Sequence, residues 1–77
     1  GTSHSVLNGQ SFSVPSGSIT QFNQPSANST AINRVLGHNP SAIFGTLSSN
    51  GRLVLVNPSG IAVGAGAAVD TAGYRLA

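Results

Sequence analysis

Apolar residues occur along this chain in short bursts that alternate with polar residues, and most bursts end at a turn-forming residue. Such alternation is typical of β-strands, in which successive side chains point to opposite faces. Helix-favouring Glu, Lys and Met are absent, so the pattern indicates strands rather than helices. About eight short strands are predicted, over residues 11–14, 19–22, 31–36, 42–47, 52–56, 61–63, 68–69 and 74–76.

One kind of turn, an amide followed by Pro and Ser, recurs three times. The copies are Gln24-Pro25-Ser26, Asn39-Pro40-Ser41 and Asn57-Pro58-Ser59, which are 15 and 18 residues apart. Proline fixes φ and removes a hydrogen-bond donor, so it suits a corner where a strand must end. A turn that recurs at this interval suggests a coiling chain in which each coil ends at the same kind of corner. Three unrelated polar turns are the alternative interpretation.

A second regularity favours a solenoid over a sandwich or a barrel, which the strand spacing also allows. Phe22 and Phe44 lie 22 residues apart, and so do Gly51-Arg52-Leu53 and Gly73-Tyr74-Arg75-Leu76. A coil of three short strands and three turns needs about 20 residues. The prediction is therefore an all-β parallel β-helix (β-solenoid) of about three to four rungs, forming a single module over residues 1–77.

Composition excludes several classes of function. Only 5% of the residues are charged, namely Asp70 and the three arginines Arg34, Arg52 and Arg75. These charges form no phosphate-tracking cluster in the sequence, so nucleic acid is not an expected partner. The longest apolar stretch, residues 61–69, is too short to span a bilayer, so the chain is not expected to be membrane-embedded. Cysteine is absent, which excludes disulfides and Cys-based metal sites.

Candidate catalytic chemistry is sparse. Serine is plentiful, but a hydrolytic triad also needs a base and an orienting acid, for which only His4, His38 and Asp70 are available. Gly64-Ala65-Gly66 starts like a dinucleotide-binding loop, yet Val69 stands where the third glycine is needed. The chain is therefore not expected to be an enzyme, and no catalytic residue, cofactor or metal site is predicted.

The order of the motifs resembles the N-terminal two-partner-secretion domain of the filamentous haemagglutinin family. Asn57-Pro58-Ser59-Gly60-Ile61 is similar to the family's Asn-Pro-Asn-Gly-Ile, with Ser59 replacing the second Asn. Asn39-Pro40-Ser41-Ala42 approximates a second family motif, Asn-Pro-Asn-Leu. The resemblance covers about residues 6–76. Its other matching segments are residues 21–26, 32–37, 42–43 and 50–56.

The resemblance implies a right-handed parallel β-helix that a Gram-negative bacterium secretes, to the medium or to its cell surface. In the family, this domain is recognised by the periplasmic part of a dedicated outer-membrane transporter and helps to nucleate folding of a long β-helical adhesin. The corner residues would then act as the secretion motif, while the apolar residues stack inside the coil. The predicted core ladder is Phe22, Ile32, Ile43, Phe44, Leu53, Leu55, Ile61 and Val63.

The family domain is longer and has an N-terminal cap, whereas this chain is expected to begin and end within the coil, with residues 1–5 as a tail or cloning remnant. An uncapped solenoid exposes strand edges that can pair with another chain. The main prediction is thus self-association: subunits stack end to end into an extracellular filament or biofilm-matrix fibre. The alternative is a truncated secretion domain of a large adhesin, in which replacing Asn57 should abolish export if a transporter reads that motif.

Overall fold

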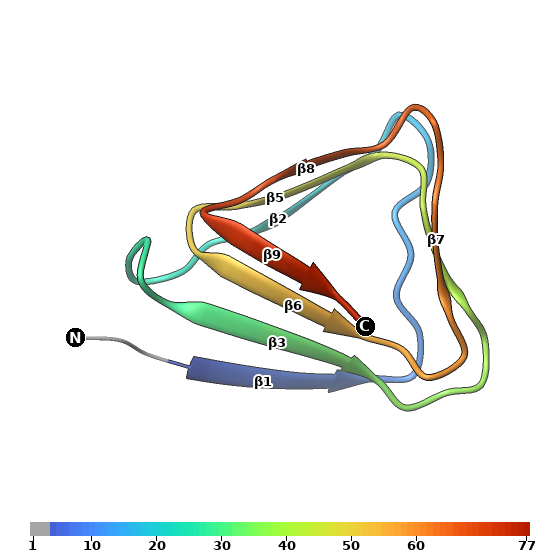
Figure 1. Ribbon diagram of the computed structural model, residues 1–77, viewed down its shortest axis with the longest axis horizontal. Coiled ribbons are helices and arrows are strands. Elements are labelled where there is room, and N and C mark those ends of the chain that lie inside the picture. Colours follow the sequence, from blue (N-terminus) through green and yellow to red (C-terminus); the bar gives the residue numbers. More distant parts are fainter. Residues whose placement is uncertain (1–3) are drawn as a thin grey trace.

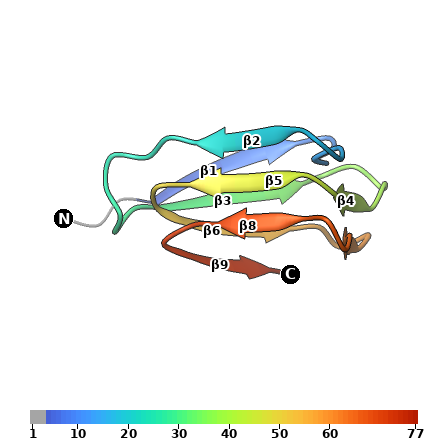
Figure 2. The same ribbon diagram turned by 90° about the horizontal axis from the view of Figure 1, so that it is seen from above.

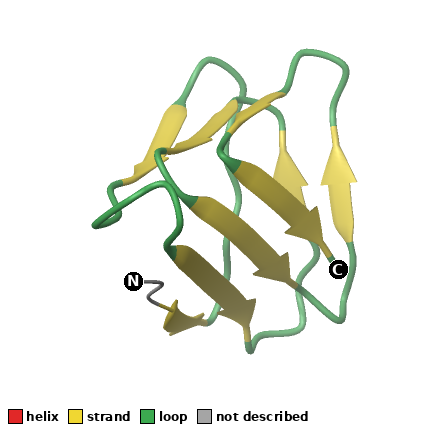
Figure 3. Ribbon diagram, turned by 60° about the vertical axis from the view of Figure 1, so that its left-hand side comes forward, coloured by secondary structure: helices red, strands yellow, loops and turns green. Residues whose placement is uncertain are grey.

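A computed structural model describes residues 4–77, which form strands and loops without a helix (Figure 3). The strands follow one another around a three-sided coil (Figure 1). Their bounds are β1 (His4–Gly9), β2 (Ile19–Phe22), β3 (Thr30–Val35), β4 (Ser41–Ile43), β5 (Thr46–Ser49), β6 (Arg52–Val56), β7 (Ile61–Val63), β8 (Ala68–Asp70) and β9 (Gly73–Leu76).

Three parallel sheets form the sides of the coil. Sheet A has the strand order β1-β3-β6-β9, sheet B contains β4 and β7, and sheet C has the order β2-β5-β8. All the strand pairs are parallel. In Figure 1 the chain circles counter-clockwise while it advances toward the viewer, from β1 to β9. The fold is therefore the predicted right-handed parallel β-helix.

Successive coils lie on one another as rungs, which Figure 2 shows from the side. Along sheet A, His4 pairs with Thr30, Thr30 with Arg52, and Arg52 with Gly73, so the coils contain 26, 22 and 21 residues. The result is about three turns, within the predicted range. His4 and Ser5 belong to β1, whereas the rest of the expected N-terminal tail lies outside the described residues.

The stacking register differs from the predicted one. Phe22 pairs with Ser49 rather than with Phe44. Leu53 pairs with Tyr74, so the two Gly-initiated segments are displaced by one residue and their glycines do not stack. The sequence spacing was misleading because the corners differ in length from coil to coil, and the first coil is longer than the second.

The core is a column of aliphatic side chains inside the coil. Val14 lies outside the named strands but forms a parallel bridge with Ile43 of sheet B. Through Val14 the first coil also takes part in this side of the coil. Burying one aliphatic side chain of this size stabilises a fold by about 1.5–3 kcal/mol. The buried apolar residues are Val14, Ala31, Val35, Ile43, Leu47, Leu53 and Leu55.

The predicted core ladder lies only partly inside the coil. Its members Ile43, Leu53 and Leu55 are buried. Phe22 and Ile61 are partly buried and pack on the core. Ile32 alternates with the buried Ala31 and Asn33, which shows that its side chain faces outward. Ile32 and the 46% exposed Phe44 do not belong to the inner ladder, so their prediction as core residues is wrong; Val63 is 53% exposed. Phe44 follows the inward-facing Ile43 and points out, whereas Val63 pairs with Ile43 on the last described strand of sheet B.

Candidate functional site

The predicted secretion motif lies where the chain turns from sheet A to sheet B. We call this turn the A–B corner and count it between the pairs Arg34–Val56 and Ser41–Ile61; it comprises residues 35–40 in the second coil and residues 57–60 in the third. β6 delivers Asn57 to the corner directly after its last residue, Val56, and β7 begins at Ile61. The five-residue motif therefore forms the whole corner of the third coil together with the first residue of the following strand.

Asn57 is an internal part of this corner, since only 2% of it is exposed. Its Nδ2 amide donates to the backbone carbonyl oxygen of Asn39 at 3.0 Å and to the Ser41 hydroxyl at 2.9 Å. Its Oδ1 accepts the backbone N–H of Ser59 at 2.9 Å, which forms an Asx-type turn. The side chain of Asn57 thus joins the second and third coils and at the same time shapes its own turn.

The rest of the turn is displayed to solvent. Pro58, Ser59 and Gly60 are exposed, whereas Ile61 packs against the core. Gly60 has φ near 113°, a conformation that side-chain-bearing residues rarely adopt, and its N–H donates to the carbonyl oxygen of Asn57 at 3.0 Å. The motif therefore divides into a buried anchor at Asn57 and an exposed tip at Pro58 and Ser59.

The second copy, Asn39-Pro40-Ser41, occupies the same corner but in a different way. Arg34 pairs with Val56 and Ser41 pairs with Ile61, so the corner of the second coil is two residues longer than that of the third. As a result Asn39 and Pro40 are exposed, and only Ser41 is buried. The structure brings the two copies together through the bonds of Asn57 to the Asn39 carbonyl and the Ser41 hydroxyl.

The first copy lies at a different corner, so the three copies do not occupy one position of the coil. Gln24 lies between β2 and β3, at the corner where sheet C leads into sheet A. Its backbone N–H and carbonyl bond the Oδ1 and Nδ2 of Asn50, both at 2.7 Å. Its own Nε2 donates to the Ser49 hydroxyl at 2.8 Å and to the Arg52 carbonyl at 2.9 Å. Sequence reasoning missed this clamp, although the dipeptide Asn50-Gly51 is a strong turn signal.

The residues considered for catalysis are distributed over three parts of the coil. His4 lies on β1, His38 lies in the A–B corner, and Asp70 lies on β8 in sheet C. Among residues 4–77, no group of three His, Cys, Asp or Glu side chains could hold a metal ion. The same part of the chain contains no helix long and apolar enough to cross a membrane.

Comparison with known proteins agrees with this architecture. The profile of the TPS (two-partner secretion) secretion domain matches residues 1–77. The chain is 44% identical, over 63 residues, to a heme/hemopexin-binding protein of Haemophilus influenzae (strain ATCC 51907 / DSM 11121 / KW20 / Rd); the match covers 82% of this chain and 7% of that protein. A second H. influenzae heme/hemopexin-binding protein is 36% identical over 73 residues, which cover 95% of this chain and 8% of the relative.

The chain therefore spans less than a tenth of the length of these curated relatives. No solved structure matches it significantly. The profile covers all the residues that build the three sheets and the A–B corner. The motif order, the right-handed parallel coil and the profile lead to one conclusion: this chain belongs to the family of two-partner secretion domains.

Proposed function

We propose that this module directs a large exported protein of a Gram-negative bacterium to its outer-membrane transporter. The observation that carries the proposal is the position of the Asn57–Ile61 motif, which forms a complete, well-bonded corner with a solvent-exposed tip. Membership of the secretion-domain family supports this function better than that of a filament subunit. The exported protein would reach the cell surface or the medium.

Within the corner, the exposed tip makes the contact and the buried amide holds it in place. Pro58 and Ser59 face solvent together with Asn39 and Pro40 of the preceding coil. These residues are uncharged, so the periplasmic part of the transporter would read shape and hydrogen bonds rather than charge. Replacing Asn57 tests this poorly, because a variant with a buried anchor removed can lose export through unfolding alone.

The same module is suited to nucleating further coils. Tyr74 pairs with the core residue Leu53 and is on the inner side of β9, where 58% of it is exposed and can be covered by a further rung. The open edge of a parallel sheet presents unpaired N–H and C=O groups that can template another strand. We propose that the rungs described here provide that template for a β-helix outside the cell.

The same edge favours one second candidate, axial stacking of separate copies into a filament. Both terminal strands of sheet A expose inward-side apolar residues, namely Leu7 on β1 and Tyr74 on β9. Such a contact would be head-to-tail and would not close. Sedimentation velocity and negative-stain microscopy of the purified chain distinguish the two: concentration-dependent fibres support stacking, and monomers at high concentration contradict it.

A secretion assay tests the transporter contact. The chain is expressed with its cognate transporter, and the exported fraction is measured for Ser59→Glu. Because Ser59 is exposed and uses only its backbone N–H in the turn, this variant should fold normally. We expect export to fall by about tenfold, which corresponds to roughly 1.4 kcal/mol of lost binding.

Ser16→Glu is the matched control, since Ser16 is also exposed but lies in the turn before β2. It should be exported like the unmodified chain. Circular dichroism of both variants must show the native melting temperature, so that a loss of export reports recognition and not folding. Normal export of a folded Ser59→Glu variant would contradict recognition through this corner.

A further inference from the structure

The three arginines of the chain, far apart in sequence, converge on one surface. Arg34, Arg52 and Arg75 lie on β3, β6 and β9 of sheet A, and each is exposed. Val35 and Leu53, next to Arg34 and Arg52, are buried, and Arg75 pairs with Val54, which lies between the buried Leu53 and Leu55. Because strand residues alternate, the three guanidinium groups project from the outer side of the coil. We call the outer side of β1, β3, β6 and β9 the arginine face.

An aliphatic ladder crosses the middle of the arginine face. Val6 pairs with Ile32, Ile32 pairs with Val54, and Val54 pairs with Arg75. Val6 is half exposed, whereas Ile32 and Val54 are partly exposed. Parallel sheets are normally covered on both faces, so a bare aliphatic ladder on the outside of one is a surface to which another segment can bind.

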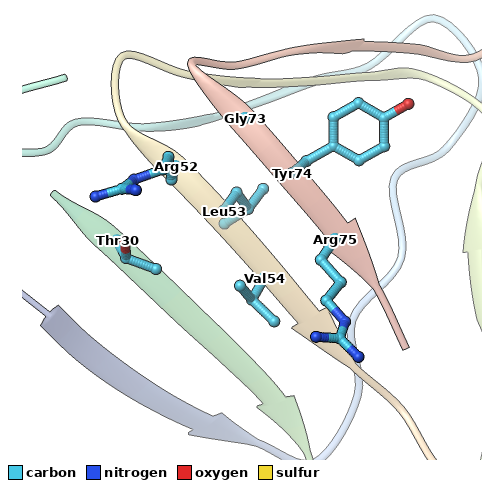
Figure 4. Close-up of a pocket in the computed structure, with 7 residues that line it drawn as sticks. All are labelled: Thr30, Arg52, Leu53, Val54, Gly73, Tyr74 and Arg75. Atoms are coloured by element: carbon cyan, nitrogen blue, oxygen red, sulfur yellow. The ribbon is translucent and has the colours of Figure 1, made fainter. Parts of the chain in front are cut away.

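A shallow depression adds shape to this face (Figure 4). Gly73 follows Thr30 and Arg52 in one outward-facing column. A shallow hollow of about 320 Å³ is lined by these three residues together with Leu53, Val54, Tyr74 and Arg75. Figure 4 shows the side chains of Arg52 and Arg75 on either side of Val54, while Tyr74 points from β9 in another direction. An apolar side chain of a partner could enter between the two cationic groups.

The charge of the arginine face is uncompensated by any acidic side chain. Asp70, the single acidic residue of the chain, pairs with Ser48 on the outer side of sheet C. Arg52 donates through Nη2 to the backbone carbonyl oxygen of Asn28 at 2.8 Å, which holds one guanidinium at the edge of the face. A partner that complements this surface would therefore carry carboxylates.

We infer that the arginine face binds an extended acidic protein segment with the pattern acid–x–apolar–x–acid. Alternate residues of a strand are about 7 Å apart, which is also the separation of the outward columns of sheet A. A straight segment laid from Arg52 on β6, across the aliphatic ladder, to Arg34 on β3 would cross two outward columns while shifting by one rung. It would therefore lie about 20° from the strand direction. Aligned sheets pack at a similar angle, about 30°.

The chemistry favours a protein segment over a lipid surface. The arginine fork binds carboxylates with two parallel hydrogen bonds, and short aliphatic side chains between the cations suit the alternating face of a strand. A membrane-binding surface usually combines many cationic side chains with aromatic side chains that insert into the lipid, whereas this face has three cations and no outward aromatic residue. The inference does not rest on the proposed transporter function, because the A–B corner is a separate, uncharged surface.

The test uses a fluorescently labelled peptide, Glu-Thr-Val-Thr-Glu-Thr-Val-Thr-Glu, and the same peptide with Gln in place of Glu. Anisotropy titrations with the full chain should show binding of the Glu peptide, at least tenfold weaker binding of the Gln peptide, and loss of affinity as salt is raised. Arg34→Gln and Arg75→Gln should each weaken binding about twofold to fivefold. Arg52 is left unchanged, since its bond to Asn28 also supports a corner.

Asp70→Asn is the control variant, because it changes one charge on another sheet and should leave the affinity unchanged. Amide chemical-shift changes on addition of the Glu peptide should be confined to β3, β6 and β9. Equal binding of the Glu and Gln peptides would overturn the inference, as would shift changes at residues 57–60. Binding of phosphatidylserine vesicles without binding of the Glu peptide would also overturn it, in favour of a lipid surface.

Discussion

The most informative perturbation of this fold is Asn57→Ala, because one side chain connects two coils. The substitution removes three hydrogen bonds and leaves the Ser41 hydroxyl, which is 1% exposed, without its donor. A buried polar group left without a partner costs about 1–3 kcal/mol. The carbonyl of Asn39 and the N–H of Ser59 lie at an exposed turn and can be hydrated, so each of these bonds contributes about 0.5–1 kcal/mol.

The expected loss in the free energy of unfolding of Asn57→Ala is therefore about 3 kcal/mol. A chain of this length is stable by roughly 4–12 kcal/mol, so the loss is a large fraction of the total. For a domain of this size, 1 kcal/mol corresponds to about 4–8 °C in melting temperature. We expect Asn57→Ala to melt roughly 12–24 °C below the unmodified chain, as measured by circular dichroism.

Asn39→Ala is the matched control, since it alters the same residue type in the other Asn-Pro-Ser motif. Asn39 is exposed and contributes only its backbone carbonyl to the bond with Asn57, which the substitution preserves. Its melting temperature should change by no more than that of an ordinary surface variant, about 0.5 kcal/mol. If the two variants lose equal stability, the assignment of Asn57 as the anchor between coils is wrong.

Two further predictions concern packing inside and outside the coil. A Cβ at Gly64 would overlap the ring of Phe44, so Gly64→Ala should cost about 1–2 kcal/mol, and adding Phe44→Ala should remove that cost. Additive losses in thermal melts of the single and double variants would contradict this contact. Leu55→Glu places a carboxylate in the core and should abolish cooperative unfolding, because an unpaired buried charge costs several kcal/mol. Val54→Glu, one residue away on the outer side, should leave a native-like transition; similar melts for both would refute the assigned strand faces.

The fold could be predicted from the sequence because it depends on two local signals. Alternating apolar residues specify which strand side chains face inward, and Pro, Gly and Asn residues mark where strands end. The register could not be predicted, because it depends on how many residues each corner absorbs. Phe22 and Phe44 share a 22-residue spacing, yet only a coil of matching length would have stacked them.

The candidate site was predictable in position but not in detail. The motif at residues 57–61 is recognisable from its letters, but the same letters Asn-Pro-Ser at residues 39–41 give an exposed Asn, whereas Asn57 is buried. The difference arises from the neighbouring coil, which supplies a carbonyl and a hydroxyl to Asn57 alone. The arginine face was hidden for the same reason, since its residues meet only through the strand register.

The unequal corners have a consequence for how such a chain can vary. Between the second and third coils the A–B corner shortens by two residues, while the turn from sheet B to sheet C lengthens by two, as the pairs Ile43–Val63 and Thr46–Ala68 show. Strand pairing is unaffected by either change. Insertions and deletions at these corners should therefore alter the outline of the coil without disturbing its stacked strands. The exposed tip of a corner, away from an anchor such as Asn57, is in effect a graft point where a short foreign loop could be displayed on a three-sided column.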